Sequence, residues 1–192
     1  MKTTTKALKE WKVAVNALER GETIMLLRKG GIREENNRFT MENNQVLLYP
    51  TFEHQKPKLL KPKYASQVEI VTSGWHPETV KISSFAEITD ILPIKDESIV
   101  GRLFPYHIWN EEFVSDRLKF KPSQPLFVLL LRTYKLPAIT EIPYRQEYGG
   151  CRSWIDLGIS IDISEISPVF SEEEYGEKVA EINQFLGTLM NG

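Results

Sequence analysis

The amino-acid sequence predicts an α+β domain with a mixed or antiparallel sheet and amphipathic helices at both ends. Apolar residues recur at helical spacing near each end of the chain, and segments rich in β-branched residues lie between them. The chain has 192 residues, 41% of them hydrophobic, which is enough to bury one substantial core. We therefore expect a single domain over residues 1–192.

The first expected element is an amphipathic helix that begins after Thr4 or Thr5 and ends at Gly21. Threonine is a common N-cap, and glycine often follows the last helical residue. The apolar face of this helix would consist of Leu8, Trp11, Ala14, Val15 and Leu18.

Strands should follow over residues 23–28 and 46–49, and prolines between Pro50 and Pro62 indicate a loop after them. β-branched residues then predict one long or bent strand over 79–94, interrupted near Ser83.

A later run, residues 125–134, should form the central strand. Its apolar residues are continuous and do not alternate, which is typical of a strand buried on both faces. The apolar part is far too short to span a bilayer.

Three helices have local start signals. One should begin near Asp96, and another should be capped by Asn110 and stopped by Pro122. The last, over about 171–190, should begin with a capping box formed by Ser171 and the glutamates after it. Its apolar stripe is Tyr175, Val179, Ile182, Leu186 and Leu189.

Composition restricts the function. A net charge of -2 and a pI near 6.0 argue against binding polyanions by bulk charge, so any nucleic-acid contact must be local. The single Cys151 cannot form an intramolecular disulfide, and no apolar signal core opens the chain, so a cytoplasmic protein without membrane contact is expected. One cysteine and three scattered histidines do not make a metal-ligand set, and no cofactor is expected.

The segment Arg28-Lys29-Gly30-Gly31 ends the first predicted strand in two cations and two glycines. Glycine permits close approach of the backbone, and arginine and lysine supply a planar fork and a point charge, so these residues can hold phosphate or carboxylate oxygens. A glycine-rich turn with solvated basic side chains is the alternative.

A second cluster, residues 144–154, combines aromatic, cationic and glycine residues in one loop. Arg152 can face a phosphate or stack on a base, and Tyr148 or Trp154 can offer an aromatic face. The alternative is that Tyr148 and Trp154 are hydrophobic anchors that pin a long loop to the core, and for Trp154 the two roles are equally favoured.

The loop after the second predicted strand carries His54 and Gln55. Glutamine offers a donor and an acceptor to the edge of a base, and an imidazole can act as acid or base near neutral pH. Solvated loop residues are again the alternative.

A metal-dependent nuclease would need an acid-x-Lys strand preceded by another acid. The chain contains one such triplet, Glu10-Trp11-Lys12, which falls in the first predicted helix and has no upstream acid, so this class is disfavoured.

Several of these motifs carry a resemblance. They are 7–11, 26–32, 49–51 with 53–55, 107–109 and 148–154. On them the chain resembles domain of unknown function family 1802, a bacterial family prominent in cyanobacteria, over nearly its whole length. That resemblance implies kinship and names no activity.

The order of elements also resembles PUA-like domains, especially the ASCH and EVE groups. This likeness implies a small β-barrel with flanking helices that binds RNA or holds a modified base in a pocket. The ASCH pattern has a lysine soon after the glycine and an acid two residues before the arginine, where this chain has Glu22 and Leu26. The departure disfavours ASCH-type hydrolysis and leaves binding as the expectation.

The leading hypothesis is a PUA-like protein that binds RNA, DNA or a nucleotide. Arg28 and Lys29 would contact phosphate, and Gly30 and Gly31 would allow close approach. A nucleic-acid-processing enzyme, with a divergent metal site or with Glu53 and His54 as acid and base, is the second hypothesis, and a protein-interaction module is the third. The residues expected around a base are His54, Gln55, Tyr148, Arg152 and Trp154.

Overall fold

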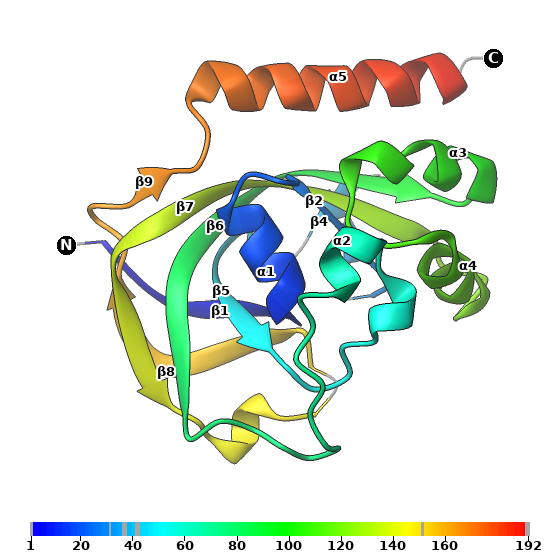
Figure 1. Cartoon of the computed structure of the whole chain (residues 1–192). Helices are drawn as coiled ribbons and strands as arrows, with labels where there is room; N and C mark the ends of the chain where they lie inside the picture. The colour runs from blue at the N-terminus through cyan, green and yellow to red at the C-terminus, as the bar shows by residue number, and fades with distance from the viewer. Residues whose placement is uncertain (1, 31, 36–37, 41–42, 151, 191–192) are drawn as a thin grey trace.

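The computed structural model describes residues 2–30, 32–35, 38–40, 43–150 and 152–190 (Figure 1). It is a mixed α+β structure built on one seven-stranded sheet, with five α-helices around it. The strands of this sheet are β1 (Thr3–Trp11), β2 (Met25–Arg28), β5 (Gln45–Thr51), β6 (Thr79–Ile94), β7 (Leu126–Pro143), β8 (Trp154–Asp162) and β9 (Ser167–Pro168).

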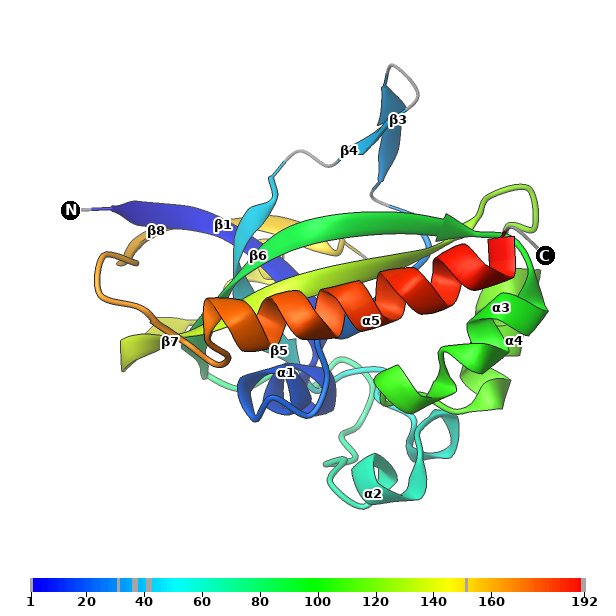
Figure 2. The same ribbon diagram turned by 90° about the horizontal axis from the view of Figure 1, so that it is seen from above.

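The strand order is β2-β7-β6-β5-β1-β8, and β9 pairs with β7. Only β1 and β5 run parallel, and every other pair in this sheet is antiparallel. The sheet is strongly curved (Figure 1). Among the described strands, β2 and β8 each have one neighbour, so the sheet is open and the expected barrel is not confirmed. A separate ribbon, β3 (Arg33–Glu35) with β4 (Arg38–Thr40), projects from the body (Figure 2).

The helices are α1 (Lys12–Glu19), α2 (Pro62–Ala65), α3 (Glu97–Arg102), α4 (Glu111–Lys119) and α5 (Glu172–Met190). Short 3-10 turns lie at η1 (Pro57–Leu59), η2 (Phe104–Tyr106) and η3 (Gln146–Tyr148). No helix in the described part of the chain is both long and apolar enough to cross a membrane.

Two apolar clusters hold these elements together. The larger one joins one face of the sheet to α1, α3, α4 and α5, and the smaller one lies among β1, β5, β8 and the outer parts of β6 and β7. A break in the register of β6 between Ile82 and Ser84 lets the long β6-β7 pair serve both clusters.

The expected helix before Gly21 is wrong for its first half, which is strand β1. Ala7 packs in the smaller cluster and Leu8 in the larger one, so successive side chains face opposite sides, as in a strand. Leu8 and Trp11 are three apart, which mimics helical spacing, but pairing of β1 with both β5 and β8 overrides the local pattern. Helix α1 supplies the second half of the expected segment, and Gly21 follows its end with φ +67°.

The other elements agree with the sequence more closely. The long strand β6 spans 79–94, and β7 begins at Leu126, covers the rest of the predicted central strand and extends nine residues beyond Tyr134 to Pro143. Asn110 caps α4 by accepting a hydrogen bond from Phe113 N at 3.1 Å.

The capping box at α5 is formed by Ser171 and Glu174, whose side chains each accept the other's backbone N–H, at 3.2 and 2.8 Å. Of the predicted stripe of this helix, Tyr175, Ile182 and Leu186 are buried and Val179 is partly buried, whereas the side chain of Leu189 lies outside the described part.

Candidate functional site

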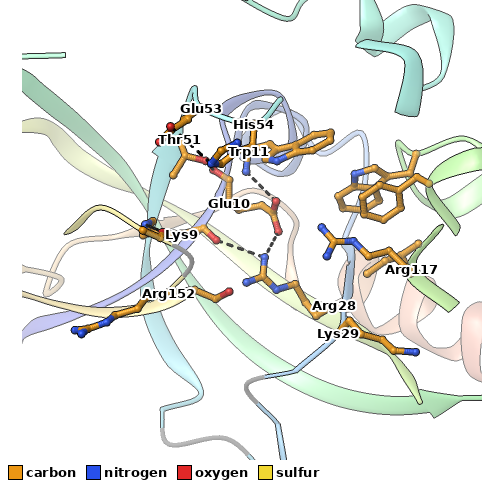
Figure 3. Close-up of a pocket in the computed structure, with 15 residues that line it drawn as sticks. Lys9, Glu10, Trp11, Arg28, Lys29, Thr51, Glu53, His54, Arg117 and Arg152 are labelled. Atoms are coloured by element: carbon orange, nitrogen blue, oxygen red, sulfur yellow. Dashed lines mark hydrogen bonds and ion pairs between the residues drawn. The ribbon is translucent and has the colours of Figure 1, made fainter. Parts of the chain in front are cut away.

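A cavity of about 260 Å³ lies at one edge of the sheet, where several strands end (Figure 3). Because β1 and β5 run parallel, both end at this edge of the sheet, and because β8 is antiparallel to β1, the loop before β8 arrives at the same edge. Four predicted residues from three separate segments therefore line one cavity: Arg28, Lys29, His54 and Arg152. The remaining lining residues are Lys9, Glu10, Trp11, Leu27, Thr51, Glu53, Trp109, Phe113, Arg117, Gly150 and Ser153.

An ion pair between Glu10 and Arg28 lies in this cavity. Arg28 Nη1 donates to Glu10 Oε2 at 2.6 Å and to the carbonyl oxygen of Lys9 at 3.4 Å. The side chains are 7% and 13% exposed for Glu10 and Arg28. The other carboxylate oxygen of Glu10 accepts the backbone N–H of Trp11 at 2.8 Å, so the acid also fixes the junction from β1 to α1.

A second guanidinium, that of Arg117 on α4, lines the same cavity. Burial and the neighbouring positive charge of Arg28 lower the pKa of Arg117, and Glu10 opposes that effect. The guanidinium carbon lies 4.9 Å from the centre of the Phe113 ring, which stacks on Trp109 at 5.0 Å. The Phe113 and Trp109 rings therefore stabilise the positive charge of Arg117, which the charge of Arg28 opposes.

Two hydrogen-bond donors of the lining lack an acceptor within the described part of the chain. They are the ammonium of Lys29 and the indole N–H of Trp109, and both nitrogens are buried. Burial lowers the pKa of Lys29 because the charged form loses solvation. An anionic ligand would satisfy such donors.

The loop before β8 forms another wall of the cavity, and hydrogen bonds from Lys9 hold this loop in place. The Lys9 ammonium donates to the carbonyl oxygens of Tyr148 and Gly150, the latter at 2.9 Å, and the Lys9 backbone N–H donates to Ser153 O at 2.7 Å. In Figure 3, Arg152 at this wall and Lys29 lie on opposite sides of Arg28.

A family model described as "Domain of unknown function (DUF1802)" matches residues 7–181. The chain belongs to the DUF1802 family. The matched span contains every residue that lines the cavity. Neither the curated proteins nor the solved structures include a significant match to this chain.

In this DUF1802 protein the predicted site residues fall into two groups. Besides the four that line the cavity, Gly30 adopts φ +102°, a conformation that favours glycine, and nothing lies within 4 Å of the position of an added Cβ. Gly31 and Cys151 lie outside the described residues.

Gly30 does not line this cavity, and neither do three residues predicted to surround a base. Tyr148 is 1% exposed and donates its hydroxyl to Leu157 O at 2.7 Å, and Trp154 is half-buried against the larger apolar cluster. Gln55 is buried: its Oε1 accepts the backbone N–H of Val13 at 3.1 Å, and its Nε2 donates to Phe52 O at 3.4 Å. These contacts give all three residues structural roles.

His54 stands at the rim with 71% of its side chain exposed, and its backbone φ is +66°. This left-handed conformation is uncommon outside glycine and recurs at functional positions. Its Nε2 is 3.7 Å from Glu53 Oε1, and that oxygen also accepts the backbone N–H of Gly74 at 2.9 Å.

Sequence reasoning missed Glu10, Lys9 and Arg117 as members of the site. From the sequence, Glu10 was considered only as part of the family motif 7–11 and of the acid-x-Lys triplet. The structure places that triplet at the end of β1 and the start of α1. Within the described residues, no group of three or more histidine, cysteine, aspartate or glutamate side chains is arranged to hold a metal ion.

Proposed function

We propose that this protein binds a nucleic acid or a nucleotide by holding its phosphate in the cavity. The observation that carries the proposal is the charge of the lining: five lysine and arginine residues face two glutamates, in a chain whose net charge is -2. Such a local excess of positive charge attracts polyanions without bulk charge.

The chemistry of the lining supports a phosphate in particular. An arginine presents a planar fork of donors that matches phosphate oxygens, and the cavity contains three arginines: Arg28, Arg117 and Arg152. The bonds of Arg28 to Glu10 and to Lys9 O both run through Nη1, which leaves the other guanidinium nitrogens to face a ligand.

The resemblance of the sequence to PUA-like domains adds a proposal about the fold. PUA-like domains are associated with RNA and modified bases, and we keep that relationship as part of the proposal; the sheet of this chain is mixed. The sheet is open between β2 and β8, so the cavity and not the fold is the main support for binding.

Fluorescence anisotropy with labelled single-stranded RNA and DNA oligonucleotides, at low and at near-physiological salt, tests the proposal. We expect binding at low salt that weakens steeply as salt rises, because phosphate contacts release counterions. Failure of both oligonucleotides to bind at low salt would refute the proposal.

Two variants address the cavity itself. Arg152→Gln removes an exposed cavity arginine, and we expect roughly tenfold weaker binding and a salt slope smaller by about 1. The double variant E10Q/R28Q removes both charges of the ion pair together, so neither partner is left as an uncompensated buried charge. Arg102→Gln, on the exposed part of α3 and outside the cavity lining, is the matched control and should bind as the unmodified protein does.

An enzyme acting on the same ligands is a second candidate, which the conformation of His54 beside Glu53 favours. An imidazole at the mouth of an anion-binding cavity is placed to exchange a proton with a bound phosphate ester. Incubation with oligonucleotides and nucleotides, followed by separation of products, distinguishes the candidates. Turnover that His54→Asn abolishes without weakening binding would favour the enzyme.

A further inference from the structure

A shallow aromatic groove of about 50 Å³ adjoins the cavity. The two hollows share Lys9, Thr51, Glu53 and Gly150 in their linings, so they are neighbours. Six rings line this aromatic groove. Tyr49 and Tyr148 are buried at its base, and the others belong to Phe52, Trp75, His76 and Tyr144.

The rings are held in two ordered pairs. Phe52 and Trp75 meet edge to face, with ring centres 5.5 Å apart at 75°. His76 and Tyr144 stack with centres 3.6 Å apart at 10°. The first pair has the edge-to-face geometry that aromatic pairs prefer, and the second is stacked nearly face to face.

Backbone contacts fix the segment that carries Trp75 and His76. Glu53, which belongs to both linings, accepts the N–H of Gly74, the residue before Trp75, at 2.9 Å. The backbone N–H of Tyr144 donates to Glu78 O at 2.9 Å. The groove is therefore anchored to the wall that it shares with the cavity.

Core packing does not explain the outermost ring. Trp75 is 42% exposed, whereas Tyr148 beneath the groove is 1% exposed and uses its hydroxyl within the fold. A large exposed ring beside a cationic cavity is the arrangement in which single-stranded nucleic-acid binders stack a base while basic side chains hold its phosphate.

We propose that the aromatic groove receives the base of a nucleotide whose phosphate lies in the cavity. This inference rests on the proposed function and assigns the base contact to Trp75 and Phe52, in place of Tyr148 and Trp154. Stacking uses the face of a ring, which every base offers, so the groove should tolerate different bases and needs no deep pocket.

Isothermal titration calorimetry with three probes tests the assignment: inorganic phosphate, ribose 5-phosphate and adenosine 5′-monophosphate. We expect the nucleotide to bind roughly 10-fold more tightly than ribose 5-phosphate, in line with the contribution of one stacked base. Cytidine 5′-monophosphate should show a similar gain. A five-nucleotide strand that binds more tightly than either mononucleotide would identify a strand as the ligand.

The variant Trp75→Leu should remove this gain and leave the affinity for ribose 5-phosphate unchanged. Because Trp75 is exposed, the variant should fold, which circular dichroism checks. The matched control is Phe120→Leu, which removes another exposed ring, 52% exposed and outside both hollows, and should keep the full gain.

The results distinguish failure of the base site from failure of the proposed phosphate binding. Equal affinity for ribose 5-phosphate and the nucleotide, or a gain that survives in Trp75→Leu, would overturn the aromatic groove as a base site and leave phosphate binding intact. Absence of binding by all phosphate probes and by the strand would overturn both.

Discussion

Glu10 and Arg28 join strands that lie far apart in the sheet order. Arg28 ends β2 at one end of the order, and Glu10 lies near the end of β1, with β7, β6 and β5 between them. Their side chains nevertheless meet at 2.6 Å, and Arg28 also reaches the backbone of Lys9. An ion pair thus bridges the curved sheet where no backbone pairing connects β1 and β2 within the described residues.

Replacing Glu10 by glutamine should have two effects of opposite kinds. The free energy of unfolding should fall by about 3 kcal/mol, because loss of one partner leaves the Arg28 charge largely buried and uncompensated. Phosphate should bind more tightly, because the cavity loses a negative charge. Urea unfolding and calorimetry with inorganic phosphate measure the two effects.

Glu112→Gln is the matched control for stability. Glu112 pairs with Lys58 at 2.9 Å, but the two side chains are 49% and 68% exposed, and exposed pairs contribute less than about 1 kcal/mol. Equal losses in the two variants would show that the Glu10–Arg28 pair is as weak as a surface pair.

Much of the fold is predictable from local signals. The caps Asn110 and Ser171 lie beside the helices they start, and the β-branched run of β6 needs no distant information. Strand β1 was not predictable, because Ala7 and Leu8 become strand residues only when β5 and β8 supply partners on both sides.

The candidate site shows the same division. Arg28 and Arg152 were identifiable because cations beside glycines are conspicuous in a sequence. Glu10 and Arg117 are ordinary charged residues, and only the topology brings them to the cavity. The sequence does not show which group pairs with a buried polar side chain. Gln55 was therefore predicted to contact a ligand, whereas its side chain accepts a hydrogen bond from the backbone at the start of α1.

Gln55→Ala should destabilise the protein by about 1–2 kcal/mol, because it leaves the backbone N–H of Val13 without its acceptor at the start of α1. Thermal unfolding measures the loss. Gln146→Ala, at an exposed position, should change stability by less than about 0.5 kcal/mol. The affinity of Gln55→Ala for phosphate should be unchanged at temperatures where it is folded, and a specific loss of affinity would restore Gln55 as a ligand contact.

Gly21→Ala should be among the more damaging single substitutions, with a loss of about 2–3 kcal/mol. Gly21 has φ +67°, and an added Cβ would lie 2.7 Å from Phe170 Cζ, so strain and a steric clash add together. Gly74→Ala separates them: Gly74 has φ +78° with nothing within 4 Å of the added Cβ, and strain alone should cost about 1 kcal/mol. Equal losses in urea unfolding would exclude the clash.

Stability should decrease as the pH falls from about 6.5 to about 3, because of His107. This side chain is 2% exposed. Burial, with a smaller effect of Lys61, lowers its pKa to about 3, and the backbone of Trp109 opposes that effect only in part. In the unfolded chain the pKa returns to about 6.5, so over this interval only the unfolded state binds the proton, and each pH unit removes about 1.4 kcal/mol. When the free energy of unfolding in urea is measured between pH 7 and pH 4.5, its slope against pH should therefore be shallower for His107→Gln than for the unmodified protein. An unaltered slope in His107→Gln would mean that the imidazole takes up its proton within the folded state, which would require a path for water or an acceptor to reach the ring.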